Sequence, residues 1–216
     1  MIQNLIDYKI QQRQKDHRSS GKISPSGLGS CFRKQIYGMK STPVTNPPDA
    51  RGLRIFECGR LFHEFVQQFL PRGKTEVLVE TKMIKGFVDY VSDDTVYDLK
   101  SQRSDAFWYM ENVNYDVKKE KYNNWLQVAC YAMLLKRSKM SLVFISKDDL
   151  CIKEYTQDYE DWKEELKKEL FLISQWKMSI ELPAAKPRLY NGKECQYCNW
   201  RTKCEVDNYM NKEEVK

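Results

Sequence analysis

The stretch that decides the fold is residues 86–101, GFVDYVSDDTVYDLKS, which has the pattern of a β-hairpin. Two runs rich in valine and tyrosine flank a polar turn at residues 92–95, an arrangement typical of paired strands. A hairpin centred on that turn pairs Val91 with Val96, Tyr90 with Tyr97 and Asp89 with Asp98. The register therefore predicts two aspartates directly opposite each other.

These two aspartates form a candidate metal site. Carboxylates opposite each other on one sheet face lie about 5 Å apart and repel, so a cation is expected between them. Lys100 is two residues beyond Asp98 and so points to the same face. Oxygen ligands of this kind suit Mg²⁺ or Mn²⁺. The alternative is a solvent-exposed hairpin with ordinary polar faces, and a β-bulge would break the register.

The segments on either side of the hairpin complete an α/β protein with a mixed central sheet flanked by helices. A helix is expected to begin near Pro25, capped by Ser24 or Ser26, and to carry Cys31. Periodicity predicts further helices over residues 2–17, 51–70, 122–137 and 158–180, and strands over residues 76–81, 83–91, 96–101, 141–146 and 150–156.

Composition indicates a soluble globular protein. The 216 residues are 41% hydrophobic and 31% charged, with no apolar run long enough for a membrane span and no signal-peptide pattern. We therefore expect the cytoplasm, or the host cytoplasm for a viral protein, and no membrane partner. The net charge of +6 permits a polyanionic partner, although an ordinary lysine-rich surface explains it equally well.

Few residues of the predicted helices carry recognisable chemistry. Of the two histidines, His17 lies in a polar segment and is expected at the surface, whereas His63 lies on the 51–70 helix. Gly59, one turn earlier, is expected to let another backbone come close. A lone helical histidine is more often a packing residue than a ligand, and Glu64 and Glu57 are alternative ligands. On the 122–137 helix, Gln127 and Tyr131 share one face.

Three of the seven cysteines crowd into CQYCNWRTKC, residues 195–204. A metal site made of thiolates usually has four ligands, so a fourth cysteine is needed from elsewhere in the chain. A reducing cytosol favours metals or burial over disulfides. The isolated cysteines are expected to be buried small hydrophobes; these are Cys58, Cys130 and Cys151.

Together, these motifs resemble the PD-(D/E)XK nuclease superfamily in its RecB-like branch. The likeness is greatest to the iron–sulfur CRISPR-associated exonucleases, with an AddB-like cysteine cluster, and it spans residues 24–204. The motifs that carry it are SPSGLGSCFRKQIYG (24–38), GRLFHE (59–64), GFVD (86–89), DLKS (98–101), QVACY (127–131) and CQYCNWRTKC (195–204). The chain departs from the family pattern at Val88, where the family name has proline, and at Asp98, where many members have glutamate.

The resemblance implies a restriction-endonuclease-like core and a metal-dependent active site. Asp89, Asp98, His63 and the Leu99 carbonyl would bind Mg²⁺ or Mn²⁺. Lys100 would position the attacking water or offset developing charge. Gln127 and Tyr131 would orient Lys100 or contact DNA.

The resemblance also supplies the fourth cysteine. It implies that Cys31, Cys195, Cys198 and Cys204 bind a [4Fe–4S] cluster that acts as a structural clamp; zinc is the rival occupant. Closing so long a loop removes unfolded-chain entropy worth a few kcal/mol, on the order of a long-loop cross-link. The expected organisation is a single nuclease domain over 1–216, with a nuclease core at 51–182 and a cluster region formed by 24–40 with 190–207.

The implied activity is hydrolysis of DNA phosphodiesters by an exonuclease that prefers single strands, often 5′ to 3′ and sometimes with endonuclease activity. Arg33 and the 102–121 segment are the candidate DNA contacts; that segment mixes aromatic and basic residues, namely Phe107, Trp108, Tyr109, Tyr115, Arg103, Lys118 and Lys119. Its aromatics would equally pack against the core.

Two alternatives remain: an inactive DNA-binding or scaffold subunit with the same fold, and a zinc-stapled protein with no role on nucleic acid. Protein partners in repair, recombination or CRISPR adaptation are not identified by the sequence.

Overall fold

The structure, a computed structural model, describes residues 2–14 and 19–213, so the prediction for His17 lies outside the described residues. The chain divides into two compact units. The first comprises Met1–Gly21, Ser30–Ile55 and Phe171–Lys216, and the second comprises Lys22–Gly29 and Phe56–Leu170. We call them the cysteine unit and the sheet unit, after what each contains. The expectation of a single domain over 1–216 stays a prediction.

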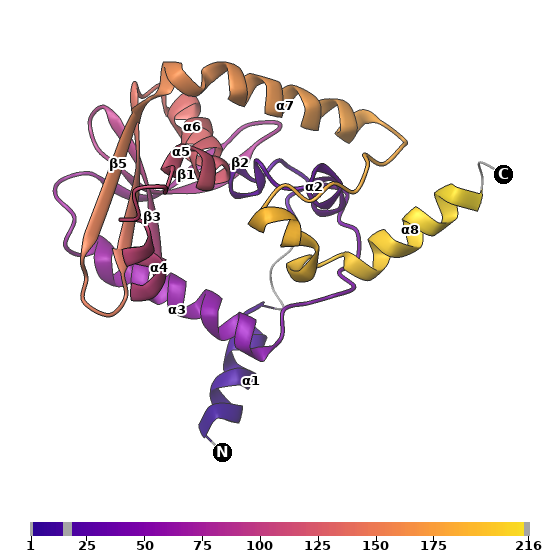
Figure 1. Cartoon of the computed structure of the whole chain (residues 1–216), viewed down its shortest axis with the longest axis horizontal. Helices are drawn as coiled ribbons and strands as arrows, with labels where there is room; N and C mark the ends of the chain where they lie inside the picture. The colour runs from indigo at the N-terminus through magenta and orange to yellow at the C-terminus, as the bar shows by residue number, and fades with distance from the viewer. Residues whose placement is uncertain (1, 15–18, 214–216) are drawn as a thin grey trace. The chain divides into compact units, whose positions relative to one another are not determined.

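The sheet unit is built on a five-stranded mixed sheet (Figure 1). Its strands follow chain order and are β1 (Lys74–Glu80), β2 (Lys85–Val91), β3 (Thr95–Gln102), β4 (Lys139–Ser146) and β5 (Ile152–Asp158). Strands β3 and β4 are parallel, and every other neighbouring pair is antiparallel. The mixed sheet flanked by helices that the sequence predicted is confirmed.

A crossover connects the parallel strands β3 and β4, because parallel neighbours cannot be joined by a tight turn. It contains α4 (Ser104–Tyr109), α5 (Val117–Glu120) and α6 (Tyr122–Leu135). Eight consecutive side chains of α6 are buried, from Trp125 to Ala132. The helix ends at Lys136 in the left-handed conformation, a common way to close an α-helix. Helix α6 contacts β3 and β4.

The last turns of α3 (Ala50–Gln67) pack on the sheet through Phe62 and Val66. These side chains contact a core cluster on β3 and β4 made of Leu99, Val143 and Ile145. Because side chains alternate along a strand, Asp98 and Lys100 point away from that cluster, to the opposite face. The sheet therefore separates the α3-packed core from the polar residues of β3.

The hairpin register is confirmed near the turn and is wrong further along. Tyr90 pairs with Tyr97 and Val91 pairs with Val96, as predicted. Asp89 and Asp98 are not ladder partners, because the pairing of β2 with β3 stops at Tyr90. On the other side of β2, the β1–β2 ladder skips the position of Glu76, whose φ of 49° is left-handed. The backbone is therefore irregular on both sides of Asp89.

The helix predicted to begin near Pro25 and its predicted cap both need correction. The helix expected from Pro25 is two elements, a 3₁₀ turn over Pro25–Gly27 and α2 (Phe32–Met39), with Cys31 at the N-cap of α2. They are separated because Gly29 has a φ of 75°, which no regular helix permits. Ser24 occupies the predicted cap position, but its hydroxyl lies 2.9 Å from the Ser26 hydroxyl instead of accepting from the backbone.

The long helix expected over 158–180 is shorter. Strand β5 extends to Asp158, which pairs with Lys139, so a 3₁₀ turn (Tyr159–Trp162) precedes α7 (Lys163–Met178). Gly59 has no neighbour within 4 Å of the position of a Cβ, so no backbone approaches it closely. None of the helices in the described part of the chain is long and apolar enough to span a membrane.

The cysteine unit contains α1 (Ile2–Gln14), α2, a kinked 3₁₀ segment over Tyr190–Tyr197, and α8 (Arg201–Glu213). Its C-terminal segment is hydrogen-bonded to the loop after α2: the Asn199 carbonyl accepts from the amides of Thr45 (3.0 Å) and Asn46 (2.9 Å). The Trp200 indole donates to the Thr42 carbonyl at 2.9 Å. Residues far apart in sequence are thereby held in one unit.

Two glycines give a matched test of the sheet unit. A Cβ on Gly29 would lie 2.9 Å from the Asn123 Cα in a left-handed backbone, whereas Gly59 is helical and open. We expect Gly29→Ala to lower the free energy of unfolding by about 1–3 kcal/mol. Gly59→Ala should raise it by up to about 1 kcal/mol. Denaturant unfolding of both variants measures this, and a stable Gly29→Ala protein would contradict the packing described.

Candidate active site and cysteine cluster

Asp98 is the most buried carboxylate of the candidate active site, with 1% of its side chain exposed. Its Oδ1 accepts hydrogen bonds from Lys100 Nζ at 3.0 Å and from Gln127 Nε2 at 2.8 Å. Its Oδ2 lies 2.9 Å from Lys100 Nζ but accepts no hydrogen bond from the described residues. One oxygen of a buried carboxylate therefore retains a lone pair for another cation.

Asp89 reaches the same site from β2. Its Oδ2 accepts from the Leu99 amide at 2.7 Å, and its Oδ1 lies 3.8 Å from His63 Nδ1. The side chain thus satisfies a β3 amide where the β2–β3 ladder has stopped. The two acids come together as the sequence predicted, but through a side-chain-to-backbone hydrogen bond instead of a cross-strand pair.

Gln127 joins the acid to the lysine. While its amide nitrogen donates to Asp98, its Oε1 accepts from Lys100 Nζ at 3.4 Å. Tyr131, one turn later on α6, is buried, and its hydroxyl would lie 2.9 Å from a Cβ on Gly86. Only glycine at position 86 leaves room for the tyrosine.

Burial and charge set the protonation of the acids and the lysine. Burial raises the pKa of Asp89 to about 6, against the ordinary value of 3.8, although Lys100 and the Leu99 amide oppose the rise. Burial likewise raises the pKa of Asp98, and the neighbouring Asp89 carboxylate adds to the rise. Burial would lower the pKa of Lys100, but Asp98 and Asp89 outweigh it, so its pKa is raised and it stays an ammonium.

His63 is a neutral imidazole at this site. Burial, followed by the positive charge of Lys100, lowers the pKa of His63, so the imidazole is uncharged at neutral pH. A neutral imidazole with a carboxylate beside it can bind a divalent cation.

Two residues at this site were missed from the sequence. Gln67 Nε2 donates to Glu76 Oε1 at 2.7 Å and to the Asp89 carbonyl at 3.2 Å. Glu76 therefore stands beside Asp89, and its charge raises the pKa of both Asp89 and His63. The only sequence signal is that Gln67 follows His63 by four residues, on the same face of α3.

The donor set suits a hard divalent cation, since carboxylate oxygens and one imidazole are available and Asp98 Oδ2 is unsatisfied. Within the described residues, however, no three His, Cys, Asp or Glu side chains are close enough together to hold a metal ion. The ammonium of Lys100 instead occupies the space beside Asp98. Leu99 contributes its amide to Asp89, and the role of its carbonyl stays a prediction.

The four cysteines named as cluster ligands all lie in the cysteine unit. Burial raises the pKa of the Cys195 thiol, and the nearby Cys31, Cys198 and Cys204 raise it further. All four are free thiols. Four thiolates are a ligand set that suits a [4Fe–4S] cluster or zinc, but in the described residues these cysteines do not form a closed metal-binding group either.

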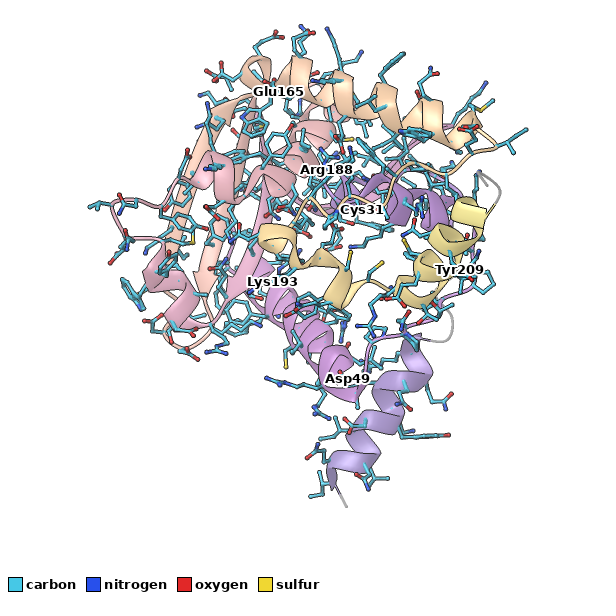
Figure 2. All side chains as sticks on the ribbon, turned by 45° about the vertical axis from the view of Figure 1, so that its right-hand side comes forward. Cys31, Asp49, Glu165, Arg188, Lys193 and Tyr209 are labelled. Carbon is cyan, nitrogen blue, oxygen red and sulfur yellow. The ribbon has the colours of Figure 1, made fainter. Side chains whose placement is uncertain are left out.

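Polar groups hold this set of cysteines in place. The Cys31 amide donates to both oxygens of Glu194 at 3.1 Å, and Glu194 is itself 1% exposed. Arg33 Nη1 donates a weak hydrogen bond to Cys204 Sγ at 3.7 Å. Arg188, labelled with Cys31 in Figure 2, contacts the residues on either side of Cys31 in the chain. It donates to the Ser30 carbonyl at 3.3 Å, and its guanidinium stacks on the Phe32 ring at 4.5 Å.

The predictions for Arg33 and for the three isolated cysteines have different outcomes. Arg33 is 3% exposed and donates to the Pro183 carbonyl and to Asn208, so it is not available to contact DNA. Cys130 is buried as predicted, but Cys58 is exposed and Cys151 is partly exposed. The prediction for Cys58 was wrong: the neighbouring apolar residues Ile55, Phe56 and Leu61 of α3 are exposed as well.

In the 102–121 segment, Phe107 packs into the core, whereas Trp108 and Tyr109 are 44% and 64% exposed. Phe107 therefore packs against the core, as the alternative interpretation of the segment predicted, whereas Trp108 and Tyr109 remain at the surface. Arg103 pairs with Asp105 at 2.5 Å.

Comparison with solved structures shows which fold this is. The crystal structure of the protein SSO0001 matches 94% of this chain and 96% of its own, with a TM-score of 0.58 and 21% identity. An alkaline exonuclease from Laribacter hongkongensis matches 73% of this chain and 88% of its own, with a TM-score of 0.51 and 12% identity. Its complex with dAMP gives a TM-score of 0.50, 13% identity, and coverage of 72% and 87%. The chain therefore shares the mixed α/β fold of an exonuclease.

No protein-family model matches the chain. A comparison with curated protein sequences also gives no match.

The buried acids predict an unusual dependence of stability on pH. With a folded-state pKa of about 6, Asp89 binds a proton more tightly folded than unfolded, so stability falls as pH rises from about 4 to 6. We expect Asp89→Asn to raise the melting temperature by a few degrees at pH 7.5 without divalent metal, because the amide still accepts from Leu99. The gain should shrink at pH 5.

The control is Asp93→Asn, at an exposed position of the β2–β3 turn. Thermal unfolding at the two pH values measures the difference between the variants. A lower melting temperature for Asp89→Asn at pH 7.5 would show that the Asp89 charge stabilises the apo fold, against the account given.

Proposed function

We propose that this protein is a divalent-metal-dependent deoxyribonuclease that acts as an exonuclease on single-stranded DNA. The observation that carries the proposal is the buried constellation of Asp89, Asp98 and Lys100, tied together by Gln127. A protein that only bound DNA would gain nothing from two buried acids that repel phosphate. The fold shared with an alkaline exonuclease, also solved with dAMP, supports DNA as the substrate.

In this proposal Asp89, Asp98 and His63 would hold Mg²⁺ or Mn²⁺. When bound, such an ion polarises a phosphate oxygen and lowers the pKa of a coordinated water. The protein residues supply the rest. Lys100, an ammonium at neutral pH, donates hydrogen bonds toward the attacking water and offsets charge that develops on the phosphate.

Gln127 acts as a positioning residue. Its two hydrogen bonds fix the distance between the Asp98 carboxylate and the Lys100 ammonium. Tyr131 packs behind this pair with its hydroxyl over Gly86. The exposed Trp108 and Tyr109 provide surfaces on which bases of a single strand would stack.

The proposal is tested by hydrolysis of end-labelled single- and double-stranded DNA in Mg²⁺ or Mn²⁺, with protein purified without oxygen. We expect metal-dependent degradation by the wild type and at least a hundredfold loss in Asp98→Ala and Lys100→Ala. Asp94→Ala, at an exposed turn position of the same hairpin, should keep full activity. Wild-type protein that binds DNA without cutting it would make the chain a binding or scaffold subunit.

We also propose that Cys31, Cys195, Cys198 and Cys204 hold a structural [4Fe–4S] cluster. The support is that four free thiols lie in one unit, that three of them are near enough to Cys195 to raise its pKa, and that hydrogen bonds are made by the Cys31 backbone and the Cys204 sulfur. Such a site would join segments separated by most of the sequence and so constrain the unfolded chain.

The cluster proposal has its own test. Protein purified anaerobically should be brown, absorb in the violet and contain iron. Cys195→Ser should lose the iron and unfold at a lower temperature, while Cys58→Ser, which changes an exposed cysteine, should keep both. Elemental analysis that finds zinc in place of iron would assign the site to zinc, and absence of both metals would overturn it.

A further inference from the structure

Lys121 is a cation in the sheet unit that the candidate mechanism does not use. It lies between α5 and α6 and is partly buried. Its ammonium sits over the Phe144 ring, with Nζ 5.2 Å from the ring centroid. Among the described residues no carboxylate forms an ion pair with it and no oxygen accepts a hydrogen bond from Nζ. A partly buried ammonium without an ion pair or a hydrogen bond is unusual.

The strand register places this ammonium on the face of the candidate active site. Phe144 on β4 is the direct partner of Lys100 on β3, and the two strands are parallel. Partners in a parallel ladder point their side chains to the same face of the sheet. Lys121 therefore covers the residue next to Lys100.

The two lysines are held differently. Lys100 is bound by Asp98 and Gln127, which fix it beside the acids. The Lys121 ammonium sits over the aromatic ring without a hydrogen bond from Nζ to a described residue. Burial lowers the pKa of Lys121 and the positive charge of Lys100 lowers it further, whereas the negative charge of the neighbouring Glu120 opposes the fall. Glu120 acts on Lys121 from a distance without forming an ion pair with it, so the Lys121 ammonium remains available to a further anion beside Lys100.

A phosphate supplies what Lys121 lacks. Its oxygens accept charge-assisted hydrogen bonds from an ammonium, and a polynucleotide brings a second phosphate close to the one at the acids. We propose that Lys121 binds the phosphate of the DNA strand next to the phosphate that is hydrolysed. This inference rests on the proposed nuclease function and assigns to Lys121 substrate binding and strand placement.

The competing explanation is that Lys121 only caps an aromatic ring, since a cation over an aromatic face contributes about 0.5–2 kcal/mol. Two substitutions separate the explanations. Lys121→Met keeps an apolar stem over Phe144 and loses the charge, whereas Lys121→Arg keeps both the charge and the contact. Lys168→Met removes one charge from an exposed lysine of α7 and is the matched control.

The experiment measures binding of fluorescein-labelled oligothymidylate at several salt concentrations, with Ca²⁺ in place of Mg²⁺ to slow hydrolysis, and then kcat and KM in Mg²⁺. We expect Lys121→Met to weaken binding about five- to tenfold. It should also reduce the slope of log affinity against log salt by about 0.7, the value for one phosphate contact on a single strand. KM should rise by a similar factor, whereas Lys121→Arg and Lys168→Met should stay near wild type.

The outcomes distinguish the two proposals. If the wild type cuts DNA and Lys121→Met has wild-type affinity and salt slope, the Lys121 inference is wrong and the nuclease function stands. If Lys121→Met lowers the melting temperature without changing binding, the lysine is only an aromatic cap. If the wild type neither binds nor cuts the oligonucleotide, the nuclease proposal fails and this inference fails with it.

Discussion

The hydrogen bond from the Leu99 amide to the Asp89 carboxylate is the interaction on which the candidate site depends. The β2–β3 ladder stops after Tyr90 and Tyr97, which leaves a β3 amide without a strand partner. The Asp89 carboxylate accepts the hydrogen bond of that amide and so comes to lie between the two strands. A regular ladder would have satisfied the amide and directed the aspartate to an ordinary cross-strand position.

Once Asp89 is held there, the other features of the site follow from electrostatics. Two buried carboxylates in one place are costly, and burial raises the pKa of both. Lys100 and Gln127 reduce the cost at Asp98 but leave one of its oxygens unsatisfied. The negative charge of the two acids therefore exceeds the positive charge of Lys100 beside them. A divalent cation on the acids and a phosphate on Lys121 would balance the charges of the site.

Sequence reasoning was sufficient for the parts of the fold that periodicity and turn chemistry control. The hairpin turn fixed the pairing of its first two residue pairs, and alternation along β3 separated Leu99 from Asp98 and Lys100. It was insufficient at Asp89, because the left-handed backbone at Glu76 and the break in both ladders leave no periodic signal. Gln67 and Glu76 were missed for a related reason: their roles depend on which elements approach them in space. Lys121 lies in the 102–121 segment predicted to contact DNA, but its position over Phe144 was not predicted.

For the cysteines, too, some features could be predicted from the sequence and others could not. Their spacing indicated a metal site with a distant fourth ligand, and the structure places Cys31 with the C-terminal three in one unit. What the spacing could not indicate is the polar support, in which the buried Glu194 holds the Cys31 amide and Arg33 is turned inward toward Cys204. Because Arg33 is buried, it is no longer a candidate DNA contact, although the sequence had suggested that role.

The central claim is that Asp89, Asp98 and His63 form a divalent-cation site. Titration of the apo protein with Mn²⁺, followed by electron paramagnetic resonance of the free ion, tests it without any assumption about substrate. The account predicts one strong site in the wild type, with affinity lowered at least tenfold in Asp89→Asn, Asp98→Asn and His63→Ala and unchanged in Asp93→Asn. Equal Mn²⁺ binding by the wild type and the Asp89→Asn and Asp98→Asn variants would contradict it.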